Sequence, residues 1–301
     1  TKSSQILLCI VFMSKTSIKA GIVTVFYQPS NESIDTFISF ANHGYSVVIY
    51  NNGMDTDHYK KLINSNIKII GDGQNIGLSS GLNLALNSLW KEKHIEGAIL
   101  FDQDSKPKIS LPDQLHQSFI KIKSKEKIAC IGPLIKDLKK TKIEKIITDD
   151  SYEEVDGLAT SGSYIDKQIF YKIGPFMDTL FIDCIDHEWC FRAKSMGYKI
   201  YRDISCYMLH DMGEIGVNLM GRYKPGYSSP TRHYYIVRNT IVLMKHSYVH
   251  FVWKCKEFLK TIRRIIFYIQ KKKKRVQSLK NIIYAIFDGI NGKTRKLQNS
   301  L

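Results

Sequence analysis

The sequence predicts an α/β fold with a doubly wound, mainly parallel sheet, flanking helices and basic amphipathic helices at the C-terminal end. In the first half of the chain, short apolar or β-branched segments alternate with helical patterns, as is typical of parallel sheets with crossover helices. Near the C-terminus, apolar residues recur at helical spacing among many lysines and arginines. At 301 residues, the chain is long enough for one elaborated domain or two smaller ones.

Four strands and three helices are predicted before residue 101. The strands are apolar, β-branched or aromatic, and turn-forming residues bound them. The predicted strands cover residues 22–27, 46–50, 67–70 and 97–101. The predicted helices cover residues 33–42, 56–64 and 78–90. In the last of these, Leu82, Leu86 and Leu89 share one face.

The pattern is less regular after residue 150. We expect a strand at 160–165, a helix at 186–196 that Gly197 ends, and a strand at 198–201. The predicted organisation is an N-terminal extension (1–20), an α/β domain (21–248) and a basic helical tail (249–301).

Two carboxylates follow the fourth predicted strand. Asp102 and Asp104 come directly after a buried apolar segment, where open α/β sheets bind ligands. Asp-x-Asp offers hard oxygen ligands to a divalent cation that can neutralise phosphates. The alternative is a solvated turn, and the pattern favours the ligand role.

A second acidic stretch lies about eighty residues later. Asp183, Asp186 and Glu188 are candidates for proton transfer, or they are acids that stabilise a helix N-terminus. His210 follows a strand-like segment and is either a core histidine or a third metal ligand. Asn75 lies in a glycine-containing loop that either makes a tight turn or faces a phosphate or base.

Composition excludes several classes. The six cysteines are scattered without a paired framework, which suits a reducing compartment. Cys184, His187 and Cys190 lack the second ligand pair of a structural zinc site. No apolar run reaches the roughly 18 residues that span a bilayer, and we expect no signal peptide and no function in residues 1–12.

The charge is concentrated in the tail. Residues 251–301 carry +12 of the net +16, which leaves +4 on the first 250 residues. Basic amphipathic helices of this kind suit a surface of anionic lipids. Packing on the protein body and binding to RNA are the alternatives, and we expect no nucleic-acid partner.

Six motifs in order resemble the rhamnosyltransferases of bacterial surface-polysaccharide (O-antigen) synthesis, in family 2 of the inverting glycosyltransferases with the GT-A fold. The resemblance covers about residues 22–244. The motifs lie at residues 75–83, 100–105, 160–163, 173–176, 181–192 and 232–239. No single motif would suffice, but their order is specific.

The resemblance implies roles for the acidic residues. Asp104 would bind a divalent cation, Mg²⁺ or Mn²⁺, that bridges the donor diphosphate. Asp102 would approach the ribose or join the metal shell, and His210 would complete the metal site. Asp186, six residues before Arg192, would be the catalytic base that takes the proton of the acceptor hydroxyl.

The resemblance also implies residues that bind or orient the substrates. Arg232 and Arg238 would clamp the diphosphate, and Glu188 would orient the acceptor or its helix. Asn51 stands where relatives often place the aspartate that contacts the base. Three further expected substrate-binding residues lie within the motifs: Asn75, Gln103 and Trp189.

The predicted function is metal-dependent, inverting transfer of L-rhamnose from dTDP-L-rhamnose to a polyprenyl-diphosphate-linked glycan. The expected location is the cytoplasm, peripherally at the inner face of the bacterial cytoplasmic membrane. One alternative is the same fold using a UDP-hexose or UDP-galactofuranose. Another is a non-catalytic protein that binds membranes or nucleic acid through its tail.

Overall fold

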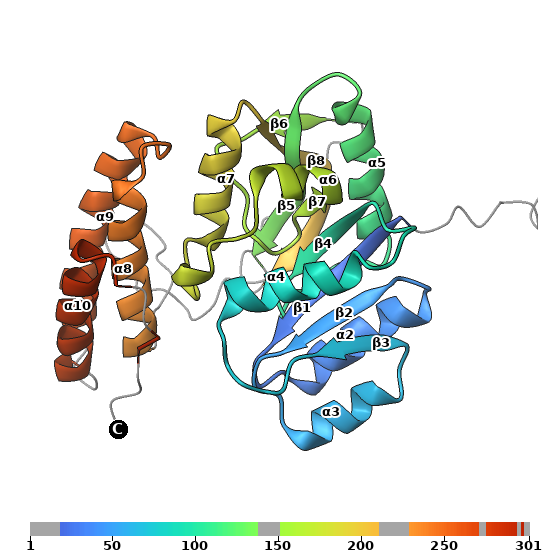
Figure 1. Ribbon diagram of the computed structural model, residues 1–301, viewed down its shortest axis with the longest axis horizontal. Coiled ribbons are helices and arrows are strands. Elements are labelled where there is room, and N and C mark those ends of the chain that lie inside the picture. Colours follow the sequence, from blue (N-terminus) through green and yellow to red (C-terminus); the bar gives the residue numbers. More distant parts are fainter. Residues whose placement is uncertain (1–18, 138–150, 211–228, 271–274, 294–295, 298–301) are drawn as a thin grey trace, which may run out of the picture.

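The structure is a computed structural model that describes residues 19–137, 151–210, 229–270, 275–293 and 296–297 (Figure 1). Residues 1–12, for which no function is predicted, lie outside the described residues. An eight-stranded sheet forms the centre, with the strand order β3-β2-β1-β4-β7-β5-β8-β6. The strands are β1 (Ala20–Phe26), β2 (Val47–Asn51), β3 (Ile67–Ile70), β4 (Gly97–Phe101), β5 (Ile128–Asp137), β6 (Tyr152–Glu154), β7 (Tyr164–Asp166) and β8 (Lys199–His210).

The sheet is mainly parallel. β1 pairs in parallel with β2 and β4, β2 with β3, and β5 with β8. β7 is antiparallel to β4 and β5, and β6 is antiparallel to β8. This arrangement confirms the predicted α/β class.

Helices cover both faces of the sheet (Figure 1). They are α2 (Asn31–Asn42), α3 (Thr56–Ile63), α4 (Leu78–Leu89), α5 (Leu111–Lys123), α6 (Lys167–Ile173), α7 (Ile185–Ser195), α8 (Pro230–Lys245), α9 (Phe251–Gln270) and α10 (Arg275–Ile290), with a 3₁₀ turn, η1 (Asp178–Leu180). Side-chain caps fix several helix starts: the Asp55 carboxylate accepts from His58 N, and that of Asp166 from Gln168 N and Ile169 N.

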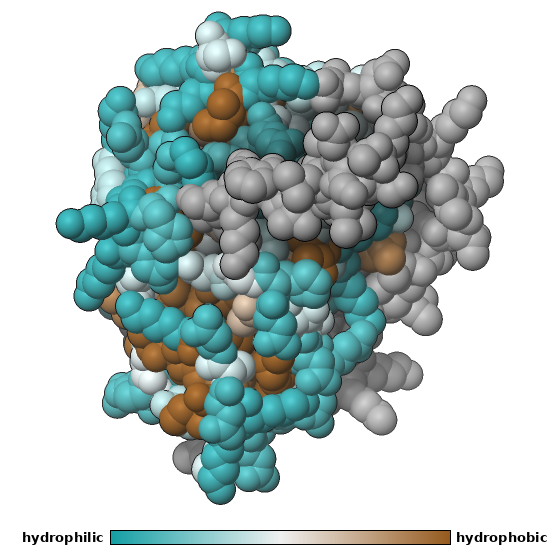
Figure 2. All heavy atoms as spheres, turned by 90° about the vertical axis from the view of Figure 1, so that its right-hand side faces the viewer, coloured by the Kyte–Doolittle hydropathy of each residue, from teal (hydrophilic) through white to brown (hydrophobic). Residues whose placement is uncertain are grey.

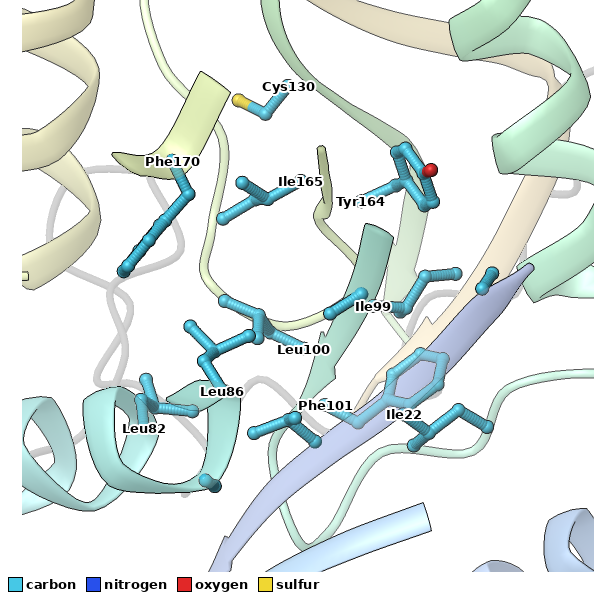
Figure 3. Close-up of a cluster of buried hydrophobic side chains, with 14 of the residues drawn as sticks. Ile22, Leu82, Leu86, Ile99, Leu100, Phe101, Cys130, Tyr164, Ile165 and Phe170 are labelled. Carbon is cyan, nitrogen blue, oxygen red and sulfur yellow. The ribbon is translucent and has the colours of Figure 1, made fainter. Parts of the chain in front are cut away.

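Successive residues of β4 show how the two faces are filled. Figure 3 shows Leu100 beside Leu86 of α4. On the other face, Phe101 packs on Phe37 and Phe40 of α2, with ring centroids 6.5 and 5.8 Å apart. Because side chains alternate along a strand, a central strand must be apolar at every position, as β4 is.

The prediction of a strand at 160–165 is wrong for residues 160–163. Residues 160–162 form a turn in which Gly162 has φ +86°, and the strand β7 begins at Tyr164. A residue with positive φ cannot continue a strand. The helices α5, α6 and α8 and the strands β5 and β6 were not predicted from the sequence.

The tail helices form a second layer with their own small core. α9 and α10 pack with α8 beside the α/β body (Figure 1). Tyr234 and Val237 of α8, Tyr268 of α9, and Ile282 and Ala285 of α10 are buried together. The tail helices therefore pack on the rest of the chain through α8, as one of the alternatives for the tail expected. The helix α8 belongs to this helical layer as much as to the α/β body.

The surface differs between the two sides of the molecule. Figure 2 shows the side opposite the tail helices, where hydrophilic side chains predominate among the described residues and hydrophobic atoms show in patches between them. Large exposed apolar side chains are concentrated instead on α9 and α10. Of the helices that the structure describes, none combines the length and hydropathy needed to cross a membrane.

Candidate active site

The carboxyl ends of β1, β2 and β4 meet at one edge of the sheet. Asp102, directly after β4, is partly buried, and its backbone N–H donates to Ser161 Oγ at 3.2 Å. Asp104 is exposed in the turn that follows. The structure thus places both predicted metal ligands at this edge, next to the turn at residues 160–163.

The backbone places His210 near the turn that follows β4. Lys106 N, two residues after Asp104, donates to the carbonyl of Leu209 at 3.3 Å. His210 is the last residue of β8, and its side chain lies outside the described part of the structure. Among the side chains that are described, no three His, Cys, Asp or Glu residues gather as metal ligands.

Asparagines hold the loop at residues 71–77 against the end of β2. Asn51 Oδ1 accepts from the backbone N–H groups of Gly53 and Met54. Asn52 donates to Asn75 Oδ1 at 3.1 Å and accepts from Ile76 N. Asn51 thus shapes the turn after β2 and Asn75 the loop at residues 71–77, and their contact with a base stays a prediction.

Gln103 ties the turn after β4 to the end of β1. Its amide group accepts from Tyr27 N at 2.8 Å and donates to Tyr27 O at 3.0 Å. Both ends of the side-chain amide are thus used within the protein. The ring of Tyr27 is exposed at this edge, so it can offer an aromatic face to a ligand. Sequence reasoning missed Tyr27, although an aromatic residue directly after the first strand is a recognisable signal.

A strained segment precedes α7. Phe181, Asp183 and Cys184 all have φ between +63° and +66°, a region that non-glycine residues rarely occupy. Such strain persists only where the surroundings enforce it, and it clusters at functional sites. Gly77, at the start of α4, packs so closely on Phe181 that an added Cβ would lie 2.6 Å from its ring.

Arg238 and Asn239 of α8 enforce this backbone. Asn239 Nδ2 donates to the carbonyls of Leu180, Ile182 and Asp183 at 2.7–2.9 Å. Arg238 is 0 % exposed and donates to the carbonyls of Thr179 and Leu180. The expectation that Arg238 clamps a diphosphate is therefore corrected: in this structure the guanidinium is enclosed by protein and holds the segment before α7.

Arg232 lies at the surface beside that segment. Its Nη2 donates to Asp183 Oδ1 at 3.0 Å, and its side chain is largely exposed. Burial raises the pKa of Asp183, and the charge of Arg232 partly offsets this effect. Arg232 remains in a position to meet an anionic ligand, and its role as a diphosphate clamp stays a prediction.

Asp186 lies in the first turn of α7 and its side chain is 24 % exposed. Its Oδ1 accepts from the backbone N–H of His187 at 2.8 Å and lies 2.9 Å from the His187 ring Nδ1. Burial alone would raise the pKa of Asp186, but the hydrogen bonds and charge of His187 lower it. Burial alone would lower the pKa of His187, but Asp186 raises it to about 9. At neutral pH the pair is a carboxylate beside an imidazolium.

Glu188 and Trp189 face the protein interior. Glu188 is 0 % exposed, accepts two hydrogen bonds from Arg192 at 2.8 and 2.9 Å, and accepts another from Tyr248. Trp189 is buried and donates to the carbonyl of Gly174. The expectation of direct substrate contact by these two residues is corrected, because their polar atoms are used inside the fold. Of the two roles expected for Glu188, orientation of its helix fits this structure.

A hollow of about 720 Å³ opens beside Asp186. Its walls come from residues 153–159, from α7 and from the start of α9.

Lys296, another residue that sequence reasoning missed, donates to the carbonyl of Asn75 at 2.7 Å. The C-terminal end of the chain thus reaches the loop after β3.

The fold is that of the GT-A glycosyltransferases. Staphylococcus aureus TarS (residues 1–349) in complex with UDP-GlcNAc matches 91 % of this chain and 81 % of its own, with a TM-score of 0.54 and 15 % identity. GalNAc-T7 with UDP, GalNAc and Mn²⁺ matches 91 % of this chain and 58 % of its own, with a TM-score of 0.51 and 14 % identity. No protein-family model matches the chain.

Sequence similarity gives a more specific relative. The dTDP-rhamnosyl transferase RfbF of Shigella flexneri is 28 % identical over 300 residues, which cover 93 % of this chain and 97 % of that protein. Fold and sequence similarity together identify the chain as a glycosyltransferase, and they confirm the resemblance described above. The alternative of a non-catalytic binding protein is thereby set aside.

Proposed function

We propose that the chain is an inverting rhamnosyltransferase that moves L-rhamnose from dTDP-L-rhamnose to a polyprenyl-diphosphate-linked glycan. The similarity to a dTDP-rhamnosyl transferase over nearly the whole of both chains carries this proposal. The arrangement of Asp186, ionised and beside an open hollow, supports it.

In the proposed reaction Asp186 is the general base. Its Oδ1 already accepts from His187, so we assign Oδ2 to take the proton of the acceptor hydroxyl. The deprotonated oxygen attacks the anomeric carbon while the bond to the diphosphate breaks on the opposite side. One base suffices for this single displacement, unlike the two carboxylates of a retaining glycosidase.

We propose that a divalent cation binds at the edge of the sheet after β4. Asp102 and Asp104 supply carboxylate oxygens there, and the backbone of residues 209–210 lies beside the same turn. Mg²⁺ is commonly held by one or two carboxylates together with substrate phosphates. When bound, such an ion stabilises negative charge on the departing diphosphate. We assign Asp104 and Asp102 as two ligands of this cation and His210 as the third.

The donor nucleotide is proposed to lie along the same edge. Tyr27 offers an exposed ring, and the loop at residues 71–77 leads into α4, whose first N–H groups favour anions in general. In this structure, however, Leu78 N donates to Phe181 O at 2.6 Å. The diphosphate is therefore assigned to the cation and to Arg232 rather than to the start of α4.

Association with an anionic membrane surface would bring the enzyme to a lipid-linked acceptor. Exposed apolar side chains on α9 and α10, among them Phe251 (74 % exposed) and Val276 (82 % exposed), support it. Lysines and arginines lie between them, and this combination binds anionic bilayers. We place the enzyme at the inner face of the cytoplasmic membrane on this basis.

The experiment is transfer by the purified protein with Mg²⁺ or Mn²⁺, a lipid-linked glycan acceptor and a panel of nucleotide sugars. We expect dTDP-L-rhamnose to be turned over faster than UDP-hexoses or UDP-galactofuranose. Asp186→Asn should lower kcat by roughly 10²–10⁴-fold, because it removes the base, and should leave dTDP binding unchanged in calorimetry. Preference for a UDP-sugar would overturn the donor assignment, and full activity of Asp186→Asn would overturn the mechanism.

A further inference from the structure

The hollow beside Asp186 extends along one face of α7. His187, Phe191 and Lys194 line it from one side of the helix, and Asp186 lines it from the first turn. Its opposite wall is the segment at residues 153–159. A volume of about 720 Å³ lies within the range of small-molecule sites, roughly 300–1,000 Å³.

An aromatic corner closes the hollow at its α9 end. The Trp253 ring lies 5.1 Å from that of Phe191 in an edge-to-face arrangement and 6.0 Å from that of His187. Trp253 is half-buried and lines the hollow. An indole in this position presents apolar area to a ligand at low cost in conformational entropy.

The charges that line the hollow do not favour an anionic ligand, because the cations are paired with carboxylates. Lys194 pairs with Asp156 at 2.5 Å, and Arg202 pairs with Glu153 at 3.2 Å. Both cations thus have carboxylate partners, the imidazolium of His187 is paired with Asp186, and Glu154 pairs with Lys199. The lining has no excess of positive charge to attract a nucleotide diphosphate or a nucleic acid, whereas a neutral polyhydroxylated ring would find many hydrogen-bonding groups.

We infer that this hollow is the acceptor subsite, that it binds neutral pyranose rings of the glycan acceptor, and that Trp253 is the platform on which one ring stacks. The inference rests on the proposed function, since Asp186 would take the proton of a hydroxyl bound here. It also makes α9 part of the substrate site, so the helical tail contributes to acceptor specificity as well as to membrane binding.

The test compares Trp253→Ala, Trp253→Phe and the control Tyr59→Ala, which removes an exposed aromatic ring from α3. We expect Trp253→Ala to raise the KM for the glycan acceptor by roughly tenfold or more, as for the loss of one stacking contact of about 1.4 kcal/mol. The KM for the donor and the rate of donor hydrolysis without acceptor should not change. Trp253→Phe should restore most of the affinity, and Tyr59→Ala should behave like the wild type.

A second readout does not depend on turnover. Trp90 and Trp189 are buried, so acceptor glycan added without donor should quench or shift the fluorescence of Trp253, and Trp253→Phe should remove that signal. An unchanged acceptor KM in a folded Trp253→Ala variant would overturn the inference while leaving the proposed function intact. If the wild type uses no nucleotide sugar but the glycan still quenches Trp253, the subsite stands and the proposed function fails.

Discussion

Asp186 and His187 form a pair whose charges depend on each other. The carboxylate raises the pKa of the imidazole to about 9, and the imidazole in turn holds the pKa of the carboxyl below its usual range. A proposed base with a lowered pKa is ionised throughout the neutral range, at the cost of lower intrinsic basicity. His187 therefore fixes both the geometry and the protonation state of Asp186.

Removing His187 should shift the pH profile of the enzyme. In the wild type, Asp186 loses activity by protonation only below its ordinary pKa of 3.8. In His187→Asn the ring and its charge are gone, while the burial that raises the carboxyl pKa remains. The acid limb of kcat/KM should therefore move to higher pH. The control is His94→Asn, at an exposed histidine near Glu92, and an unmoved acid limb in His187→Asn would contradict this coupling.

At the scale of elements, α8 controls the entry to α7. Three residues with positive φ turn the chain into α7, and Asn239 satisfies three carbonyls of this segment. Asn239 is fully buried, so its loss would remove an interior donor from these carbonyls. Because the strained segment leads directly into the turn that carries Asp186, α8 acts as a positioning element for the proposed base.

Replacing Asn239 by Ala should destabilise the protein and slow transfer. Leaving buried carbonyls without a donor costs about 1–3 kcal/mol, which should lower the Tm. Relaxation of the segment would displace Asp186, with a loss in kcat of up to about 10²-fold and little change in the KM of the donor. Asn291→Ala is the control, since this exposed asparagine bonds only locally to Phe287 O. Unchanged kcat in a destabilised Asn239→Ala would limit Asn239 to a structural role.

At the scale of the molecule, charge and apolar exposure are both polarised. The α/β body is nearly neutral, and the tail carries most of the positive charge together with most of the large exposed apolar side chains. On the opposite side, hydrophilic side chains predominate among the described residues, with hydrophobic patches between them (Figure 2). A molecule built this way can lie on a membrane by one side while its other side faces water.

Vesicle binding tests this arrangement. The protein should sediment with vesicles containing phosphatidylglycerol, bind weakly to phosphatidylcholine alone, and be released in part by high salt, because screening weakens the electrostatic contribution. Phe258→Ala should weaken binding by roughly tenfold, because burying a Phe side chain contributes about 1.5–3 kcal/mol. Tyr59→Ala, on α3, should bind normally. Equal binding to both lipid compositions would contradict the electrostatic part of the proposal.

The sequence alone determined the first four strands, the class of fold and the carboxylate edge. Residues 97–101 are apolar at every position because both faces of β4 are covered, and the acids that follow could be placed at the sheet edge by topology alone. The helix α7 was predicted within one residue of its bounds because Gly197 ends it. These features depend on local pattern, so they are readable without tertiary contacts.

The tertiary structure decided what the polar side chains do. Arg238, Glu188 and Trp189 stand in motifs that suggest substrate contact, yet each has its polar atoms paired inside the fold. Burial and partner are properties of distant segments brought together, so residue type and spacing could not reveal them. The hollow beside Asp186 could not be predicted for the same reason. Its walls come from residues 153–159, α7 and α9, which only the folded chain places side by side.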